Sequence, residues 1–370
     1  MLFISNEDSA TGAPVVLATL LQWLDEEKKN ISFDYVTLSH GTLSDTIKKR
    51  RLNFFDLTKR KESSRFYLRN LFNRIENRLR FFLLLSKIKR QSYDLIYGNT
   101  VIVLPLIKKL KHRFPDTPVI LHVHEMAGVI QNFVTHFSHY DQLVSHYIAP
   151  SLLVRDDLLL KFQISESKVT VIHETSPRLS GVPVTGNEQQ LPFLVGAAGH
   201  VTFRKGFDLF IAVANYISTY YADFKIEFVW VGTVPQTERR FIDEEIRKSG
   251  LNGIVNFTGF RSEPLAEMQK FHLFLLPSRE DPFPLVCLEA GHLGIPIICF
   301  KDATGIQEIK AKGVHVVPYG DVRAMSECIV QYYNSREAIV RNGLDNHNVF
   351  KQFHYKTICP QLYEVIEKSG

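Results

Sequence analysis

The amino-acid sequence predicts an α/β protein with two doubly wound domains. Short apolar runs rich in β-branched residues alternate with longer helical patterns from end to end. The runs are apolar throughout, which is typical of parallel strands that are buried on both faces of a sheet. A chain of 370 residues also exceeds what one hydrophobic core usually organises.

The expected strands fall into two groups of six, each with helical patterns between them. In the first half we expect strands at 2–5, 33–38, 94–98, 119–124, 147–150 and 169–173. In the second half we expect them at 193–198, 226–231, 254–258, 273–277, 296–300 and 314–317. This alternation predicts one Rossmann-like doubly wound sheet in each half. After residue 334 we expect only two helices, the first capped by Ser335 and ending near Asn342, the second within 356–368.

The boundary between the halves is marked by composition. Residues 175–192 contain three prolines, two glycines and no strong periodicity, which predicts an interdomain linker. We expect an N-terminal domain over 1–176, a C-terminal domain over 190–345, and a helical segment over 346–370 that returns to the first domain. Doubly wound domains bind ligands at the carboxyl ends of their strands, so we expect two domains that face each other across a ligand-binding cleft.

Positive charge is concentrated in one segment. The net charge is +5, but residues 48–90 hold 15 Lys and Arg against three acids, which leaves −7 for the rest of the chain. If 64–90 is a helix, six of its apolar side chains fall within an arc of about 100°. The apolar residues of this stripe are Leu68, Leu71, Phe72, Ile75, Leu79 and Phe82. The basic residues that flank it are Arg69, Arg80, Arg74 and Arg78.

A basic amphipathic helix suits an anionic membrane surface, and we expect residues 48–90 to bind one. The alternative is that the stripe packs on the N-terminal sheet and the arginines are merely solvated. Nucleic acid is not an expected partner, because the segment contains no recognised binding module. The chain shows neither the pattern of a secretory signal nor an apolar run near the ~20 residues that span a bilayer. We therefore expect a cytoplasmic protein, peripheral on the inner face of the cytoplasmic membrane.

The motif most indicative of chemistry is residues 277–290, PSREDPFPLVCLEA. An apolar strand leads into a short loop, and a helix is expected to begin near Pro284. The free amides of a first helical turn can hold a phosphate. Asp281 and Glu289 would then accept hydrogen bonds from the hydroxyls of a sugar and a ribose. The alternative is that Asp281 only caps the helix and Glu289 is a solvated helix residue.

This motif resembles the signature of the retaining family-4 glycosyltransferases of the GT-B fold, in which an acidic residue and a glutamate eight positions later bind a nucleotide-sugar. Further stretches resemble the family in the same order along the chain. They are TGAP at 11–14, DLIYGNT at 94–100, HVHE at 122–125, APS at 149–151, the turn at 199–206 and FTG at 257–259.

The resemblance implies roles for individual residues. The donor-binding residues it implies are Arg204, Lys205, Gly206, Phe283, Pro284, Leu285 and Glu289. Among them, Lys205 would bind the donor diphosphate as a compact cation, and Glu289 would accept from the ribose hydroxyls. The implied catalytic residues are Gly12, His124 and Asp281. Gly12 would let the backbone approach the reaction centre, His124 would lie near the transferred sugar, and Asp281 would contact that sugar. His122 stays open as an alternative to His124.

The chain departs from the family pattern at three positions. His200 stands where the family has an arginine that binds the diphosphate, and Arg204 is the residue that we expect to replace its charge. Asp281 is one methylene shorter than the family's glutamate. Pro284 replaces a glycine and removes one N–H donor. These departures leave the donor sugar open.

The chain contains no D-x-D and no H-E-x-x-H motif or acidic cluster, so we expect no metal and no cofactor. Lys205, Arg204 and helix amides would stabilise the departing nucleoside diphosphate. The resemblance implies a retaining glycosyltransferase that moves a hexose from a nucleotide-sugar to a growing, lipid-linked glycan. A non-catalytic GT-B-fold binding or scaffold subunit, a nucleotide-sugar epimerase and a phosphorylase stay open as alternatives.

Overall fold

The computed structural model describes residues 1–10, 12–27, 31–49, 53–58, 67–179 and 191–370, without the side chains of 67–75 and 80. The chain forms two compact units. Unit 1 contains Met1–His173 and Tyr355–Gly370, and unit 2 contains Glu174–His354. Most of the predicted linker, residues 180–190, lies outside the described residues, as do Thr11 and the basic stretches 50–52 and 59–66.

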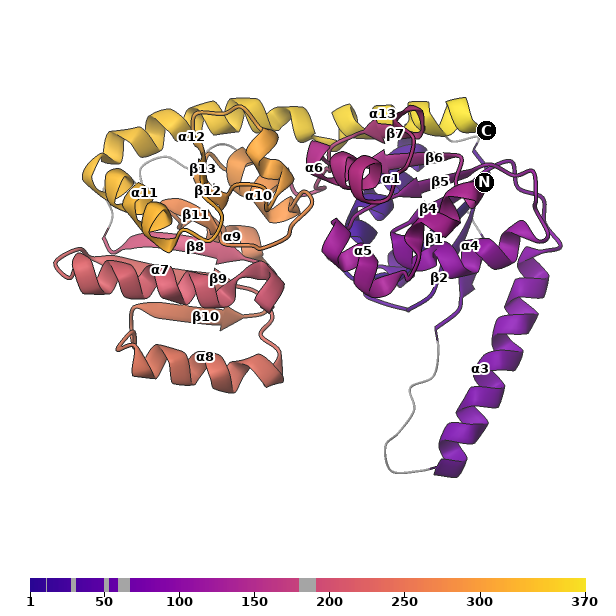
Figure 1. Cartoon of the computed structure of the whole chain (residues 1–370), viewed down its shortest axis with the longest axis horizontal. Coiled ribbons are helices and arrows are strands. Elements are labelled where there is room, and N and C mark those ends of the chain that lie inside the picture. Colours follow the sequence, from indigo (N-terminus) through magenta and orange to yellow (C-terminus); the bar gives the residue numbers. More distant parts are fainter. Residues whose placement is uncertain (11, 28–30, 50–52, 59–66, 180–190) are drawn as a thin grey trace. The chain divides into compact units, whose positions relative to one another are not determined.

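Unit 1 is built on a parallel sheet of seven strands in the order β3-β2-β1-β4-β5-β6-β7 (Figure 1). The strands are β1 Leu2–Ser5, β2 Asp34–Thr37, β3 Phe54–Asp56, β4 Ile96–Asn99, β5 Val119–His122, β6 His146–Ala149 and β7 Val169–Val171. In the central register, Phe3 of β1 pairs with Tyr35 of β2 on one side and Tyr97 of β4 on the other. All three side chains are fully buried, which explains the continuous apolar pattern of these strands.

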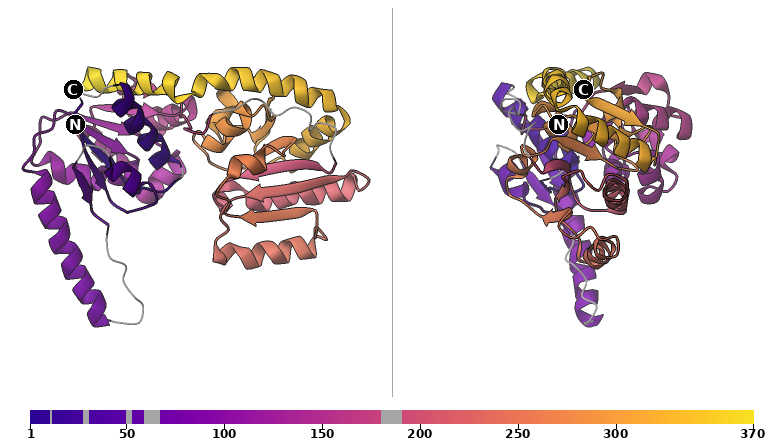
Figure 2. Two further views of the ribbon diagram at one scale, coloured as in Figure 1. Left: turned by 180° about the vertical axis from the view of Figure 1, so that it is seen from behind. Right: turned by 90° about the vertical axis from the view of Figure 1, so that its left-hand side faces the viewer.

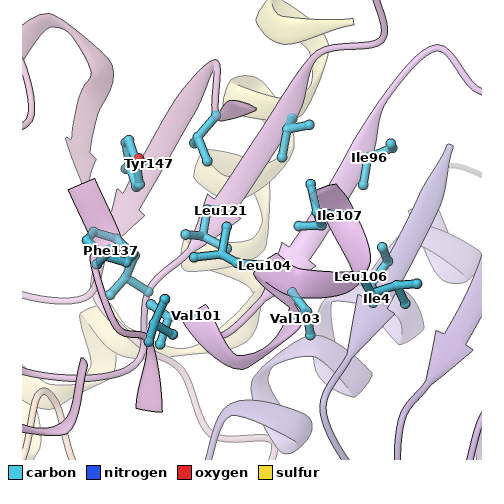
Figure 3. Close-up of a cluster of buried hydrophobic side chains, with 14 of the residues drawn as sticks. Ile4, Ile96, Val101, Val103, Leu104, Leu106, Ile107, Leu121, Phe137 and Tyr147 are labelled. Carbon is cyan, nitrogen blue, oxygen red and sulfur yellow. The ribbon is translucent and has the colours of Figure 1, made fainter. Parts of the chain in front are cut away.

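Helices cover this sheet. They are α1 Ala13–Glu27, α2 Ser44–Lys48, α3 Tyr67–Ile88, α4 Leu104–Lys111, α5 Ala127–Phe133, α6 Leu152–Asp156 and α13 Tyr355–Ser369, with the short turns η1 Val101–Val103, η2 Phe137–Leu143, η3 Asp157–Lys161 and η4 Glu166–Lys168. Figure 3 shows how α4 and η2 are fixed: Leu104 and Ile107 of α4 and Phe137 of η2 lie with strand residues such as Leu121 in one buried cluster.

Unit 2 has a parallel sheet of six strands in the order β10-β9-β8-β11-β12-β13. The strands are β8 Phe193–Ala198, β9 Ile226–Val231, β10 Val255–Gly259, β11 Leu273–Leu276, β12 Ile297–Phe300 and β13 Val314–Val317. The helices are α7 Phe207–Tyr220, α8 Gln236–Lys248, α9 Pro264–Met268, α10 Leu285–His292, α11 Val322–Asn334 and α12 Arg336–Phe350, with the short turns η5 Phe203–Lys205, η6 Gly305–Glu308 and η7 Lys351–Phe353. In Figure 1, α7 lies in front of β8 and β9, and seen from behind in Figure 2 the strands lie in front of it.

The predicted fold class, two doubly wound α/β domains, is confirmed, with two corrections. The sequence interpretation missed β3, a three-residue edge strand inside the basic segment. It also ended α12 near Asn342, whereas the helix runs to Phe350, and Ser335 stands at its N-cap without a side-chain hydrogen bond. Gly343 directly follows the predicted end. It does not end the helix, because it is the position where α12 packs directly against the carbonyl of Gly294.

The predicted basic amphipathic helix forms as α3, which extends beyond the sheet of its own unit (Figure 1). Its last turns bury Leu85 and Ile88 in the core of unit 1, and Phe81 and Leu84 pack against that core. Leu79 and Phe82, in contrast, are 58% and 67% exposed, and Leu83 is also exposed. At these two positions the predicted stripe does not pack on the sheet, and its residues 68–75 lie outside the described side chains. None of the helices of the described residues is both long and apolar enough to cross a bilayer.

The contact at Gly343 can be tested by substitution. A Cβ there would lie 2.1 Å from the carbonyl oxygen of Gly294. Intrinsic helix propensity favours alanine over glycine by about 1 kcal/mol, but over-packing against backbone costs roughly 1–3 kcal/mol. We therefore expect Gly343→Ala to lower the free energy of unfolding in a urea titration. The neighbouring Leu344→Ala, at an exposed position, should change it by less than about 0.5 kcal/mol. A Gly343→Ala protein more stable than wild type would contradict the close helix packing.

Candidate functional site

The strand order places particular loops together in each unit. In unit 2 the order reverses between β8 and β11, and in unit 1 between β1 and β4. Loops that leave the carboxyl ends of such neighbouring strands diverge to opposite faces of the sheet and leave a binding crevice between them. The site residues predicted in unit 2 follow β8 and β11, and those predicted in unit 1 follow β1 and β5.

In unit 2, Lys205 and Asp281 meet at this point. The Lys205 Nζ donates to Asp281 Oδ2, and the two side chains are only 16% and 7% exposed. Ser278 Oγ also donates to Asp281 Oδ2 at 3.3 Å, and the Asp281 amide donates to the carbonyl of Ala303 at 2.8 Å. Asp281 is therefore held by three neighbouring segments, and its charge is directed at the lysine. The alternative reading of Asp281 as a helix cap is wrong, because Pro284 is the N-cap of α10 and that N-cap has no side-chain hydrogen bond.

Gly206 makes the approach of Lys205 possible. It has φ +76°, and a Cβ there would lie 1.9 Å from the carbonyl oxygen of Pro277 at the end of β11. Only glycine fits both the left-handed backbone and this close approach. Thr202 Oγ1 accepts from the Lys205 amide at 3.3 Å and closes the turn from the other side. The turn after β8 is thus pressed onto the end of β11, which carries Asp281.

Glu289 lies in α10 and is 4% exposed, so it is not the solvated helix residue of the alternative reading. Ser176 Oγ donates to its Oε1 at 2.8 Å, and Arg178 Nη1 lies 3.8 Å from the same oxygen. Burial raises the pKa of Glu289, while Arg178 and Ser176 oppose that shift. Its second oxygen can still accept a hydrogen bond, which is what a ribose hydroxyl requires.

The other predicted donor-binding residues, 283–285, lie between Asp281 and the start of α10. Phe283 is buried with its ring against Phe353 at 5.5 Å, and Leu285 is the first residue of α10. Pro284 contributes no N–H to the first turn of α10, as expected from the sequence.

The basic residues near this centre have different partners. Arg204 donates to the carbonyl of Glu280 and is exposed, and His200 is also exposed. Arg279 is committed elsewhere, because it makes two hydrogen bonds of 2.9 and 2.8 Å to Asp208.

In unit 1, Gly12 opens α1 after β1. It has φ +58°, and a Cβ there would meet no atom within 4 Å, so open space lies in front of its backbone. The amides of Val15 and Val16 donate to its carbonyl, which anchors the loop to the helix. The loop before it is fixed by Asp8, whose carboxylate is fully buried and accepts from Tyr35 and Ser44 at 2.6 Å each.

His122 and His124 lie side by side at the end of β5, with ring centroids 4.0 Å apart. His122 is buried and shares a 2.7 Å hydrogen bond with the hydroxyl of Tyr97. His124 is less buried, and its Nε2 lies 2.8 Å from Asn99 Oδ1 at the end of β4. Burial lowers the pKa of His124 to about 3, so its imidazole is neutral at physiological pH.

Thr100, next to Asn99, carries backbone strain. Its φ is +82°, which is rare for a β-branched residue. It is 4% exposed, and its Oγ1 has no hydrogen-bond partner among the described residues. The amide of Thr100 donates to the carbonyl of His122 at 2.9 Å, which ties this strained turn to the strand that precedes His124. Such strain is characteristic of functional positions.

Sequence reasoning missed several residues of these two groups. Ser176 and Arg178 lie in the segment predicted as a linker, and no local pattern reveals that they contact Glu289. Ser278 belongs to the recognised motif, but its side chain was given no role. Asn99 lies within the DLIYGNT stretch, and its position at a strand end next to the expected histidine was the signal that could have identified it.

Two family models match the chain. The model described as Glycosyltransferase Family 4 matches residues 10–174, and the model described as Glycosyl transferases group 1 matches residues 192–335. Together they account for nearly the whole of both sheets.

Curated relatives match over shorter stretches. The O-antigen biosynthesis glycosyltransferase WclY of Escherichia coli is 33% identical over 105 residues, 28% of each chain. The 2-deoxystreptamine N-acetyl-D-glucosaminyltransferase of Niallia circulans is 32% identical over 102 residues, which are 27% of this chain and 25% of the relative. The matched stretch thus spans only about a quarter of the length of these relatives.

Solved structures match over the full length. Anabaena Alr3699/HepE in complex with UDP and glucose has a TM-score of 0.77 at 19% identity and covers 99% of this chain and 98% of its own. The lipopolysaccharide outer core galactosyltransferase WaaB, in its apo form, has a TM-score of 0.74 at 14% identity with both chains fully covered. At these identities the likeness shows the shared GT-B fold. The two family models together match residues 10–174 and 192–335, more than half of the chain, and they show that the chain belongs to the glycosyltransferases that they describe.

Proposed function

We propose that this protein is a retaining, metal-independent glycosyltransferase that moves a sugar from a nucleotide-sugar donor to a growing glycan. The observation that carries the proposal is the pairing of Lys205 with Asp281 where the strand order of unit 2 reverses. A nearly buried ammonium at such a point is suited to a diphosphate. The chain has no D-x-D motif, and its own cationic and amide groups can stabilise the departing diphosphate without a metal ion.

Binding of the nucleotide-sugar donor would replace part of the contact between Lys205 and Asp281. When a diphosphate arrives, Lys205 would exchange part of its interaction with Asp281 for the phosphate oxygens. The first-turn amides of α10 add partial positive charge. As the bond between sugar and diphosphate breaks, negative charge grows on the leaving oxygen, and groups that are already fixed stabilise it without reorganisation. Glu289, held by Ser176 and Arg178, would orient the nucleoside through its ribose.

In unit 1 we assign Gly12 and His124 to the reacting sugar and the acceptor. The open space before Gly12 lets a ligand approach the backbone. His124 is neutral, so it can form a hydrogen bond with a sugar hydroxyl without placing a charge near the reacting atoms. Asn99 orients its ring. His122 is buried and hydrogen-bonded to Tyr97, and its ring packs against the ring of His124.

We further propose that the acceptor is lipid-linked and that α3 binds an anionic membrane surface. The support is the exposed apolar set Leu79, Phe82 and Leu83 on a helix from the basic segment. Apolar side chains can insert among acyl chains while flanking basic residues attract anionic headgroups. A cytoplasmic location at the inner face of the cytoplasmic membrane is consistent with such a surface.

A non-catalytic binding subunit is the second candidate. His200 in place of the family's arginine favours it, as does Arg204, whose guanidinium donates to the carbonyl of Glu280. Binding of a donor without turnover would distinguish this subunit from an enzyme.

The first test is donor hydrolysis with a panel of nucleotide-sugars that begins with UDP-glucose. Lys205→Ala should lower the release of nucleoside diphosphate about 10²–10³-fold, as expected for a lost transition-state donor. Glu289→Ala should raise the KM of the donor by about ten- to a hundredfold. Lys248→Ala, at an exposed lysine of α8, is the control and should behave like wild type, and a metal chelator should not change the rate. Tight donor binding without release would favour the binding subunit.

A second test addresses Asp281. Asp281→Asn leaves the nearly buried Lys205 without its charged partner, which should lower the free energy of unfolding by about 3 kcal/mol. UDP supplies the missing negative charge, so it should raise the Tm of Asp281→Asn more than that of wild type. Asp302→Asn, at an exposed aspartate of the same unit, is the matched control. If only UDP-glucose and not UDP restores the Tm, then Asp281 acts on the sugar rather than through Lys205.

A third test addresses the membrane surface. Phe82→Ser with Leu83→Ser should lower binding to phosphatidylglycerol-containing vesicles at least about tenfold, since burial of one such side chain contributes ~1.5–3 kcal/mol. Phe241→Ser removes a comparably exposed phenylalanine, 52% exposed, from α8 of unit 2 and should leave vesicle binding unchanged. Equal binding by all three proteins would show that the exposed apolar residues of α3 do not enter a bilayer.

A further inference from the structure

A second binding feature lies in unit 1, on the outward side of the helical layer. A pocket of about 210 Å³ opens between α4 and η2. Its polar lining consists of Lys108 from α4, Thr135 and His136 before η2, and His139, Tyr140 and Gln142 within η2. The volume lies below the roughly 300–1,000 Å³ of pockets for drug-sized ligands, which suits a small polar group.

The lining provides donors and positive charge. Lys108 has no acidic partner among the described residues, and its Nζ lies 5.9 Å from the ring centroid of Tyr140. The rings of His136 and His139 stack with centroids 5.2 Å apart and planes 14° apart. None of the described lining residues is acidic. The acid next to the pocket in sequence, Asp141, is engaged by Lys168 at 3.0 Å and by the Tyr147 hydroxyl at 3.2 Å.

The fold holds these groups in place. The inner face of α4 buries Leu104, Ile107 and Leu110, and Phe137 anchors η2 in the same core (Figure 3). Because both elements are fixed from inside, Lys108 and the two histidines face outward on a rigid base. His136 has a left-handed backbone with φ +58°, a conformation in which histidine is enriched among non-glycine residues.

The pocket adjoins the proposed membrane surface. Beside Lys108, Lys109 Nζ lies 4.6 Å from the ring centroid of Phe81 in α3, and Arg113 after α4 donates to the carbonyl of Lys89 at 3.2 Å. Lys108 and Lys109 of α4 and His112, its C-cap, are exposed. The positive charge therefore continues from α3 across α4 to the pocket.

We propose that the Lys108–His136–His139 pocket binds a phosphate group, with the ammonium of Lys108 as counter-charge and the imidazole N–H groups as donors. The lipid source of that phosphate, a phosphodiester headgroup beside α3, rests on the membrane surface proposed above. The phosphate chemistry itself rests on the pocket alone.

The test compares two lysines one residue apart. Lys108→Gln and Lys109→Gln each remove one positive charge from an exposed position of α4, but only Lys108 lines the pocket. For vesicles of phosphatidylcholine with phosphatidylglycerol, Lys109→Gln should weaken binding about fivefold, as any basic residue near the surface does. Lys108→Gln should weaken it about thirtyfold or more, because a charge-assisted hydrogen bond is lost as well. Raising the salt concentration should diminish the Lys109 effect more than the Lys108 effect, because exposed charges are screened more.

A second probe is inorganic phosphate, titrated against the full-length protein and followed by ³¹P NMR. Saturable binding should disappear in Lys108→Gln, weaken about threefold or more in His139→Gln, and persist in Lys109→Gln. If phosphate responds to Lys108 but the two lysine variants lose vesicle binding equally, then the phosphate site stands and the lipid source is wrong. Phosphate binding that is absent, or equal in all variants, overturns the site. Even if the phosphate site is overturned, loss of vesicle binding in the Phe82→Ser, Leu83→Ser protein would support the proposed membrane surface. The donor-release test of the proposed function does not depend on the vesicle or the phosphate experiment.

Discussion

The reversal of strand order within each parallel sheet is the constraint on which the candidate site depends. It makes the loops after β8 and β11 diverge, and the space between them is where Lys205 reaches Asp281. The contact is possible because Gly206 has no side chain and its turn is pressed against the carbonyl of Pro277. The pairing of Lys205 with Asp281 thus depends on backbone packing at one place.

Most of the fold could be predicted from the sequence because buried parallel strands produce apolar runs that need no partner to be recognised. The failures have identifiable causes. The strand β3 is three residues long and lies in the basic segment 48–90, where the charge pattern led us to expect only a helix over 64–90. The end of α12 was misjudged because the helix continues through Gly343, where it packs against the carbonyl of Gly294 in a contact that no local pattern contains.

The candidate site was less predictable than the fold. Two separate motifs identify Lys205 and Asp281 as site residues, but they do not show that the two side chains bind each other, because the residues are 76 positions apart in sequence. Ser176 and Arg178 could not be found at all, since their contact with Glu289 arises from a chain segment of irregular composition. The strain at Thr100 is likewise invisible in sequence, because threonine is an ordinary strand residue and only its backbone angle departs from the norm.

Unit 1 is not continuous in the chain, and this determines the order in which the protein can be completed during synthesis. Its last helix, α13, buries Ile358, Cys359, Leu362 and Ile366 and contacts α1, yet it is translated after all of unit 2. Domains usually fold as they emerge, beginning at the N-terminus. Here unit 1 emerges first, but the surface of α1 that binds α13 stays uncovered until α13 has been translated. By then the whole of unit 2 has been synthesised. The nascent chain therefore has a period in which an apolar surface of unit 1 is available to chaperones.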